Sequence, residues 1–242
     1  MSVKKDEAIK EILADYELLA NLVLNQLDIL ETLISNSELQ LSEEQLGIIR
    51  DNENKLDKWE VKLSDNIVNT IVLYQPVASE IRKLIALYRI IISLERIGDL
   101  AVSITNFMKQ IKNENVYASL SDFISNMMIL SVKMVKNAML SFINKDMDLA
   151  IWTIRNEAVV DELNRKMLKK AIGKAQKAEE KKNVLISFIN IKEMVSNIER
   201  ISDHAANIAE ASIYAYEGKD IRHHRKQELE GKTKSSDDER NV

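Results

Sequence analysis

Four pairs of acidic residues share one spacing, a glutamate followed four residues later by an aspartate. An α-helix brings residues i and i+4 to the same face, so each pair places two carboxylates one turn apart. All-oxygen ligands of this kind suit hard cations such as Mg²⁺, Ca²⁺ and Mn²⁺, and carboxylate clusters also hold iron. The pairs are Glu53 and Asp57, Glu95 and Asp99, Glu157 and Asp161, and Glu199 and Asp203.

Carboxylates at this spacing are unfavourable on their own. Like charges at i and i+4 destabilise an exposed helix by about 0.2–0.5 kcal/mol, and we expect Glu95 and Asp99 to be partly buried among their apolar neighbours. If two helices that carry such pairs pack together, the four carboxylates must raise their pKa values or recruit cations. The alternative is a solvated surface, on which Arg96 and Arg200 form ion pairs with the preceding glutamates.

The chain consists of two similar halves. A shift of 104 residues aligns them without a gap and places the first two acidic pairs on the last two. The same shift matches Asn52 with Asn156, Lys62 with Lys166, Arg96 with Arg200, Ile97 with Ile201, Ala101 with Ala205 and Ile104 with Ile208. A repeat kept only for packing would match in apolar residues, whereas several matches here are polar. The recurrence favours a cation site in at least one half.

Apolar residues recur at helical spacing along nearly the whole chain. This pattern predicts an all-α protein, built as two tandem three-helix bundles around a pseudo-twofold axis. The predicted helices cover residues 3–34, 42–74 and 76–112 in the first unit and 122–144, 147–180 and 183–217 in the second. Ser42 and Gln45 predict a capping box, Pro76 suits a first helical turn, and Gly218 is a helix stop.

These elements divide the chain into four parts. The first unit covers residues 1–112, a polar linker covers 113–121, and the second unit covers 122–218. Residues 219–242 are highly charged and poor in apolar side chains, so we expect a disordered, solubilising tail.

Composition narrows the classes of function. The chain of 242 residues has no Cys, which excludes disulfides, thiolate metal sites and cysteine nucleophiles and fits a reducing cytosol. A net charge of -4 without a basic, aromatic-rich patch argues against nucleic-acid binding. The N-terminus lacks the apolar core of a signal peptide, and the stretch 84–94 is too short to span a bilayer. We therefore expect a cytoplasmic protein.

Two segments of the repeat have closely related sequences, ERIGD at residues 95–99 and ERISDHAANIAE at residues 199–210. They resemble the paired signatures of the PhoU family, regulators of bacterial phosphate uptake and phosphate-responsive signalling. Gln75-Pro76 and Ile81-Arg82 also stand where that family has a Gln-Pro and a Leu-Arg. The resemblance covers residues 5 to 218 and includes the duplicated three-helix architecture.

The resemblance implies a cytosolic homodimer that regulates by binding rather than by catalysis. It implies that the eight paired carboxylates hold divalent or iron cations (Mg, Mn, Fe or Zn). The implied partners are the ATPase of the high-affinity phosphate ABC transporter and a membrane sensor histidine kinase, through which alone the protein meets the membrane. Together they would restrain the phosphate-starvation response when phosphate is plentiful.

The chain departs from the family pattern at two positions. Ser103 stands where the first signature usually has Asn, whereas the second copy keeps Asn207. The resemblance therefore supports metal binding less firmly in the first unit. Ser202 replaces the usual Gly, whose counterpart is Gly98. The supporting residues implied are Arg96, Ser103, Arg200, His204 and Asn207, and we interpret His204 as a packing or outer residue because it points about 100° away from Asp203.

Two alternative interpretations remain. A ferritin-like di-iron oxidase needs Glu-x-x-His on two helices, and none of the three histidines follows a glutamate at that spacing. A metal-binding or purely structural helical adaptor unrelated to phosphate would use the same helices. In its structural form, it predicts that the intact protein contains no metal. The sequence contains no Gly-rich phosphate loop and no Arg/Lys cluster beside a helix start. It therefore gives no indication that the chain binds phosphate or nucleotide directly.

Overall fold

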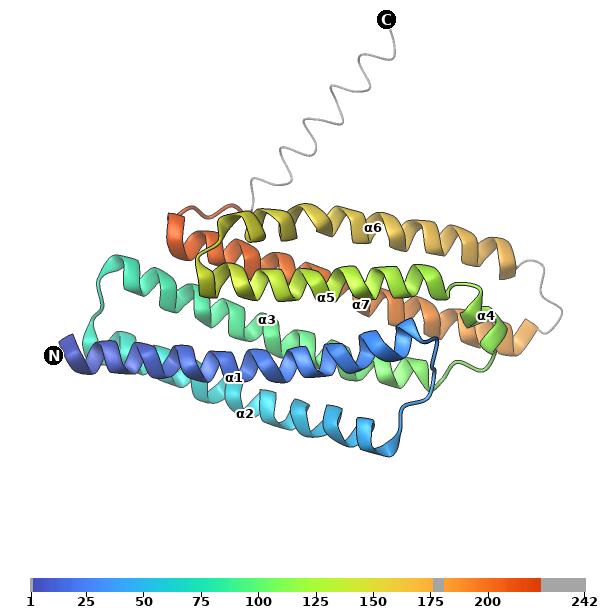
Figure 1. Ribbon diagram of the computed structural model, residues 1–242, viewed down its shortest axis with the longest axis horizontal. Coiled ribbons are helices and arrows are strands. Elements are labelled where there is room, and N and C mark those ends of the chain that lie inside the picture. The colour runs from blue at the N-terminus through green and yellow to red at the C-terminus, as the bar shows by residue number, and fades with distance from the viewer. Residues whose placement is uncertain (1, 176–180, 223–242) are drawn as a thin grey trace, which may run out of the picture.

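The computed structural model describes residues 2–175 and 181–222. Within these ranges the chain forms seven helices and no strand (Figure 1). The helices are α1 (Ser2–Ser35), α2 (Glu43–Tyr74), α3 (Ala78–Met108), α4 (Glu114–Ala118), α5 (Ser121–Asn144), α6 (Met147–Ala175) and α7 (Lys181–Glu217). The prediction of two three-helix units is confirmed: α1–α3 form the first and α5–α7 the second.

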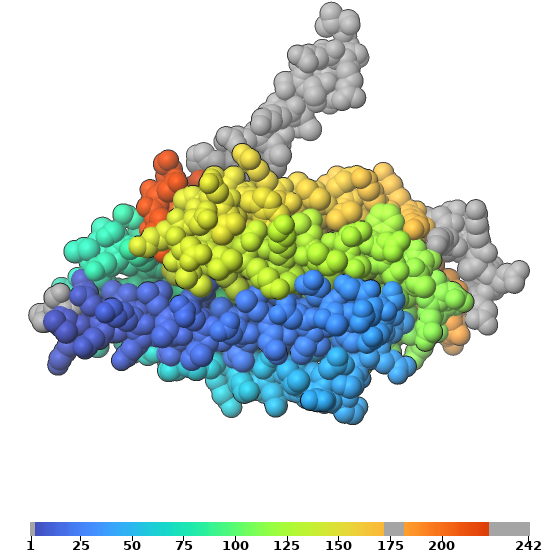
Figure 2. Space-filling view, in the orientation of Figure 1, coloured from blue at the N-terminus to red at the C-terminus, as the bar shows by residue number. Residues whose placement is uncertain are grey.

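The two units pack along their lengths into one elongated bundle. Helices α3 and α7 contact each other most extensively, and α1 also packs against α5. Figure 2 shows α1 lying along one face, between α2 and the second unit. Apolar side chains from both units form one continuous core, including Leu94 and Ile97 of α3 and Ile198 and Ile201 of α7. The helices that carry the second and fourth acidic pairs therefore lie at the centre.

Local sequence signals account for several helix ends. Ser42 and Gln45 form the predicted capping box, in which each side chain accepts a hydrogen bond from the other residue's backbone N–H, at 3.1 and 2.8 Å. The sequence predicts Pro76 in the first turn of the third helix, but α3 begins at Ala78. Glu80 defines that start instead, because its carboxylate accepts a hydrogen bond from the Val77 N–H at 2.9 Å.

The segment between the units is more ordered than a polar linker. It contains the short helix α4, and Tyr117 and Leu120 are buried in the core. The hydroxyl of Ser187, on α7, accepts hydrogen bonds from the backbone N–H groups of Lys112 and Asn113, both at 2.9 Å. These contacts begin soon after α3 ends at Met108, four residues before the predicted end. The linker thus fixes one end of α7.

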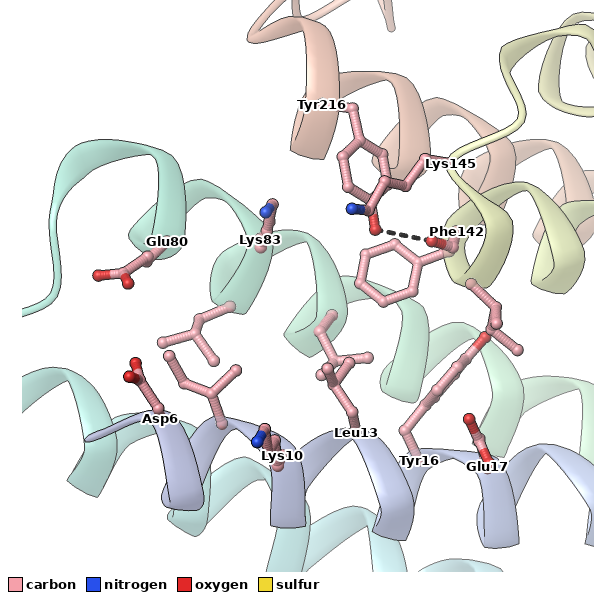
Figure 3. A pocket seen from close by; sticks show the side chains of 14 residues that line it. Asp6, Lys10, Leu13, Tyr16, Glu17, Glu80, Lys83, Phe142, Lys145 and Tyr216 are labelled. Atoms are coloured by element: carbon pink, nitrogen blue, oxygen red, sulfur yellow. Dashed lines mark hydrogen bonds between the residues drawn. The ribbon is translucent and has the colours of Figure 1, made fainter. Parts of the chain in front are cut away.

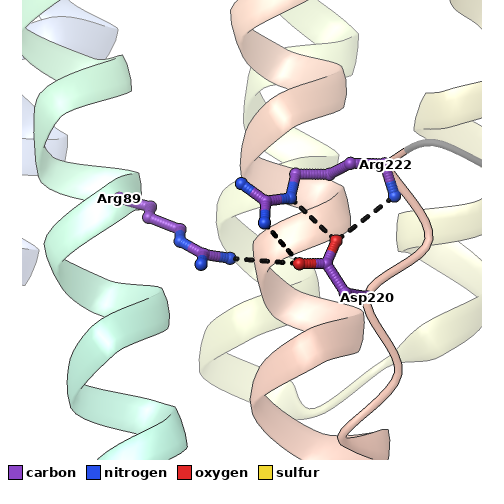
Figure 4. Close-up of polar contacts among 3 residues, drawn as sticks. All are labelled: Arg89, Asp220 and Arg222. Atoms are coloured by element: carbon purple, nitrogen blue, oxygen red, sulfur yellow. Dashed lines mark hydrogen bonds and ion pairs between the residues drawn. The ribbon is translucent and has the colours of Figure 1, made fainter.

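The predicted helix stop at Gly218 is confirmed. Gly218 adopts a left-handed conformation, with φ of 71°, directly after α7. Beyond it, Asp220 forms ion pairs with Arg89 of α3, at 3.9 Å, and with Arg222 (Figure 4). Hydrogen bonding to Arg222 lowers the pKa of Asp220 to about 2. The predicted tail therefore begins with residues that contact the bundle, whereas residues 223–242 lie outside the described chain.

Helix α1 is long and apolar enough to cross a membrane. Residues Val3–Ser35 contain a window with mean hydropathy 1.3, and no other helix in the described ranges meets this criterion. By this measure α1, rather than the stretch 84–94, is the segment that resembles a membrane span. Its apolar side lies against α2, α3 and α5, where Leu19, Val23 and Leu27 are fully buried. Core helices of bundles also pass this test, because burial selects the same residues.

Candidate metal centre

The first unit brings its acidic pairs together. Glu53 and Asp57 lie on α2, and Glu95 and Asp99 lie on the neighbouring α3. One oxygen from each of Asp57, Glu95 and Asp99 lies within 4.8 Å of the others, so the three carboxylates can reach one cation. This is the arrangement that the i,i+4 spacing on two packed helices predicts.

The charges in this cluster repel one another. Burial raises the pKa of Glu53, and the nearby carboxylates of Asp99 and Asp57 raise it further. Burial and Asp99 likewise raise the pKa of Glu95. Glu53 therefore borders the group of three carboxylates, as a four-carboxylate cluster requires. The cluster carries excess negative charge and offers only oxygen donors, and both properties fit a hard cation.

Arg96 partly neutralises the cluster. Its guanidinium lies 3.4 Å from an oxygen of Glu95 and 3.4 Å from an oxygen of Asp99. The side chain is 56% exposed, so solvent weakens these ion pairs and leaves the arginine free to move aside. The ion-pair alternative raised by the sequence thus describes part of the site. Arg96 does not cancel the effects of burial and of the nearby Asp99, since the pKa of Glu95 remains raised.

Gly98 permits the close approach of α2 and α3 beside the cluster. A Cβ atom at this position would lie 2.5 Å from Leu56 Cδ1 and 3.3 Å from Gln26 Oε1. Gln26 is fully buried and donates a hydrogen bond to the Ile49 carbonyl at 2.9 Å, so it has little room to move. In the second unit the equivalent positions hold Ser202 and Val160. The repeat thus pairs a larger residue at position 202 with a smaller one at position 160.

Replacing Gly98 with Ala should lower the free energy of unfolding by about 1–3 kcal/mol, the usual cost of overpacking a core. Urea unfolding followed by circular dichroism measures this change. Gly47→Ala is the matched control, because a Cβ atom at that position would meet no other atom within 4 Å and alanine favours a helix interior. A Gly98→Ala protein as stable as Gly47→Ala would contradict the proposed close packing.

The second unit arranges its carboxylates differently. Asn164 of α6 donates a hydrogen bond to Glu199 of α7 and so occupies one of its oxygens. Burial and the nearby Asp161 still raise the pKa of Glu199. Glu157 and Asp203 are half-buried on the same two helices. Within the described ranges, however, no second group of three acidic side chains lies as close together as the one in the first unit.

The carboxylate geometry and the departure at Ser103 favour different units. The departure at Ser103 favours the second unit as the firmer site, whereas the first unit has the closer carboxylates. The repeat also exposes two residues that the motif analysis missed. Glu60 raises the pKa of Glu95, and its equivalent 104 residues later is Asn164. The in-register comparison could have found this exchange of a carboxylate for an amide.

The other predicted supporting residues lie on α3 and α7. Ser103 is half-buried one turn after Asp99, whereas Asn207 and Arg200 are exposed on α7. His204 is half-buried, and burial lowers its pKa, with further contributions from Arg200 and from Arg96 of α3. The arginines identify the α3–α7 interface as its environment, in keeping with a packing or outer role. It is not part of the close group of carboxylates.

Comparisons with known proteins identify the family of this chain. The sequence profile of the PhoU domain matches it twice, at residues 16–108 and 124–212. The chain belongs to the PhoU family. The two PhoU matches fall on the two structural units and contain all eight paired carboxylates. The recognition of the family from residues 95–99 and 199–210 is thus confirmed.

PhoU relatives match most of the chain. A phosphate-specific transport system accessory protein PhoU homolog from Burkholderia sp is 28% identical over 71% of this chain and 73% of its own length. The phosphate-specific transport system accessory protein PhoU homolog 1 from Thermotoga maritima is 24% identical over 72% of this chain and 74% of its own length.

Solved PhoU structures share the fold. PhoU from Pseudomonas aeruginosa superimposes with a TM-score of 0.73, at 21% identity, over 88% of this chain and 99% of that one. The phosphate transport system regulatory protein PhoU from Streptococcus pneumoniae gives a TM-score of 0.76, at 20% identity, over 90% and 99%. These structures support the duplicated three-helix architecture.

Proposed function

We propose that this chain regulates a phosphate transport system from the cytoplasmic side of the membrane. It docks on the ATPase of a phosphate ABC transporter and on a sensor histidine kinase, and it restrains both when phosphate is plentiful. The observation that carries the proposal is the PhoU match across both units. Relatives matched over about seven-tenths of this chain are named as accessory proteins of phosphate-specific transport.

The carboxylate cluster supports a structural role for a cation. Asp57, Glu95 and Asp99 would hold the ion, with Glu53 bordering them. A cation there supplies positive charge that links α2 to α3 and relieves the repulsion between their carboxylates. With oxygen donors alone, Mg²⁺, Mn²⁺ or iron fits better than Zn²⁺, which favours Cys and His. No catalytic step is required of it.

Regulation by docking requires a preference among the partner's states. A bound protein shifts an equilibrium only through its differential affinity for the two states. The chain should therefore bind the phosphate-replete state of the transporter or kinase more tightly than the phosphate-starved state. The cation-braced first unit offers a rigid surface for that distinction.

Phosphate uptake by cells that lack this chain tests the proposal. We expect uptake from phosphate-rich medium to rise several-fold without the chain and to return to normal when the intact gene is restored. Radiolabelled phosphate uptake, with total transporter protein measured in parallel, separates transport activity from transporter abundance. Unchanged uptake, together with an unchanged phosphate-starvation response, would contradict the proposed function.

A further inference from the structure

A pocket of about 480 Å³ lies at the end of the bundle where α1, α3, α5 and α7 meet (Figure 3). Its volume falls within the range of small-molecule sites, and its walls are mainly apolar. The apolar lining includes Ile9, Leu13, Leu84, Leu87, Phe142 and Ile143. None of the paired carboxylates lines it, so this pocket is separate from the candidate metal centre.

Two tyrosines, Tyr16 and Tyr216, also line the pocket. Tyr16 is 1% exposed, and its hydroxyl has no hydrogen-bond partner within the described chain. The hydroxyl of Tyr216, in contrast, donates to the Phe142 carbonyl at 2.7 Å (Figure 3). A buried hydroxyl without a partner is costly, and such groups in native proteins call for an explanation. The Tyr16 oxygen is itself shielded from solvent, so it offers no open donor to the pocket.

The charged groups around the pocket favour an anion. Lys10, Lys83 and Lys145 line it, and none of them has a carboxylate partner within 4 Å in the described ranges. Lys83 lies 5.6 Å from the centre of the Tyr216 ring.

Three carboxylates, those of Asp6, Glu17 and Glu80, also line the pocket. Glu80 is already paired with Lys5 at 2.6 Å. With Lys5 included, ammonium groups outnumber carboxylates, and the positive excess lies toward Lys83 and Lys145, away from the acidic residues of α1 (Figure 3).

We propose that this pocket binds a small amphipathic anion, an apolar chain or ring that carries one carboxylate or phosphate group. The apolar body lies along Leu13 and Leu84. The anionic group meets Lys83 and Lys145. Inorganic phosphate alone would leave the apolar walls without a partner, so the ligand differs from the ion whose uptake the chain is proposed to regulate.

Isothermal titration calorimetry with ten-carbon probes tests the ligand class. Decanoate and decyl phosphate represent the two anionic headgroups, while decanol and decyltrimethylammonium share the chain without the negative charge. We expect at least one anion to bind with one molecule per chain and decanol to bind about tenfold more weakly. Equal binding of decyltrimethylammonium, saturation by inorganic phosphate in place of the anions, or no binding by either anion would overturn the proposal.

Matched variants locate the binding in the pocket. Leu13→Trp fills it from α1, whereas Leu18→Trp places the same side chain on an exposed part of that helix outside the pocket. Leu13→Trp should weaken binding of the anion at least tenfold, and Leu18→Trp should leave it unchanged. Equal effects of the two variants would contradict the assignment. The assay needs neither transporter nor kinase, so its outcome is independent of the proposed regulation.

The charge preference has its own variant. Replacing both Lys83 and Lys145 with Gln should weaken the anion about tenfold while leaving decanol unchanged, because only the charged headgroup loses a partner. The control is Lys58→Gln, because Lys58 is exposed on α2 and lies outside the pocket. Loss of decanol binding to the same extent would show that the lysines act through packing and would contradict their role as anion ligands.

Discussion

Converting Asp57, Glu95 and Asp99 together to their amides should abolish cation binding by the first unit. The three carboxylates lie within reach of one ion, and amides keep their size while removing the charge. Losing even outer contacts of a metal site costs about 10–100-fold in affinity, so removing three ligands should exceed that range. The measurement is titration with Mn²⁺, together with the metal content of protein purified without chelator.

The second unit and an exposed surface provide controls. Converting Asp161, Glu199 and Asp203 to amides should reduce metal content less, because Asn164 already occupies an oxygen of Glu199. Converting the exposed Glu114 and Glu162 should have no effect. If intact protein contains no metal and takes up none, the cation site is wrong and the acidic pairs are ordinary helix-surface residues.

Without metal, removing carboxylate charge should stabilise the protein. The pKa values of Glu53 and Glu95 are raised by folding, so the folded state binds more protons than the unfolded state. Their favourable contribution is fully present below their ordinary pKa and is lost as the pH rises through the raised values. Glu53→Gln with Glu95→Gln should therefore increase the free energy of unfolding by about 1 kcal/mol at pH 7.5 in the presence of chelator.

The pH dependence separates this effect from others. His204 acts in the opposite direction, since its lowered pKa makes the protein less stable as the pH falls through the ordinary histidine value. The informative quantity is therefore the difference between the Gln variant and the intact protein, measured by urea unfolding from pH 5 to pH 7.5. That difference should grow with pH. A difference that stays constant or shrinks would show that the carboxylates do not repel one another.

Added Mn²⁺ should reverse the ranking. An ion that binds only the folded state stabilises it according to its concentration relative to the dissociation constant. The intact protein should gain stability with Mn²⁺, while the double Gln variant should gain much less. The same carboxylates would then destabilise the metal-free protein and stabilise the loaded one, which is the behaviour expected of a binding site rather than of a packing surface.

The sequence predicts local features of the fold well because they depend on nearby residues. The capping box at Ser42, the stop at Gly218 and the shared face of Glu95 and Asp99 each follow from spacing along one helix. The 104-residue repeat extends these local predictions to the second unit. It also predicts which carboxylates have equivalents, since Glu53 and Glu157 occupy matching positions.

Features that depend on distant contacts were not predictable in this way. Helical periodicity shows which face of a helix is buried but not which helix covers it, so the packing of α3 on α7 needed the structure. The repeat aligns Asn164 with Glu60, but the hydrogen bond from Asn164 to Glu199 is visible only in the structure. In the sequence, Tyr16 looks like an ordinary core residue. Only the folded chain shows that its hydroxyl lacks a hydrogen-bond partner.

Affinity purification of the tagged chain from its own organism, grown with abundant or limiting phosphate, tests the central claim most directly. We expect recovery of a phosphate-transporter ATPase or a sensor histidine kinase in amounts that change with phosphate supply. The variant with amides at Asp57, Glu95 and Asp99 should recover less of that partner. Recovery of neither partner under either condition, with an unrelated protein enriched instead, would contradict a role in phosphate regulation.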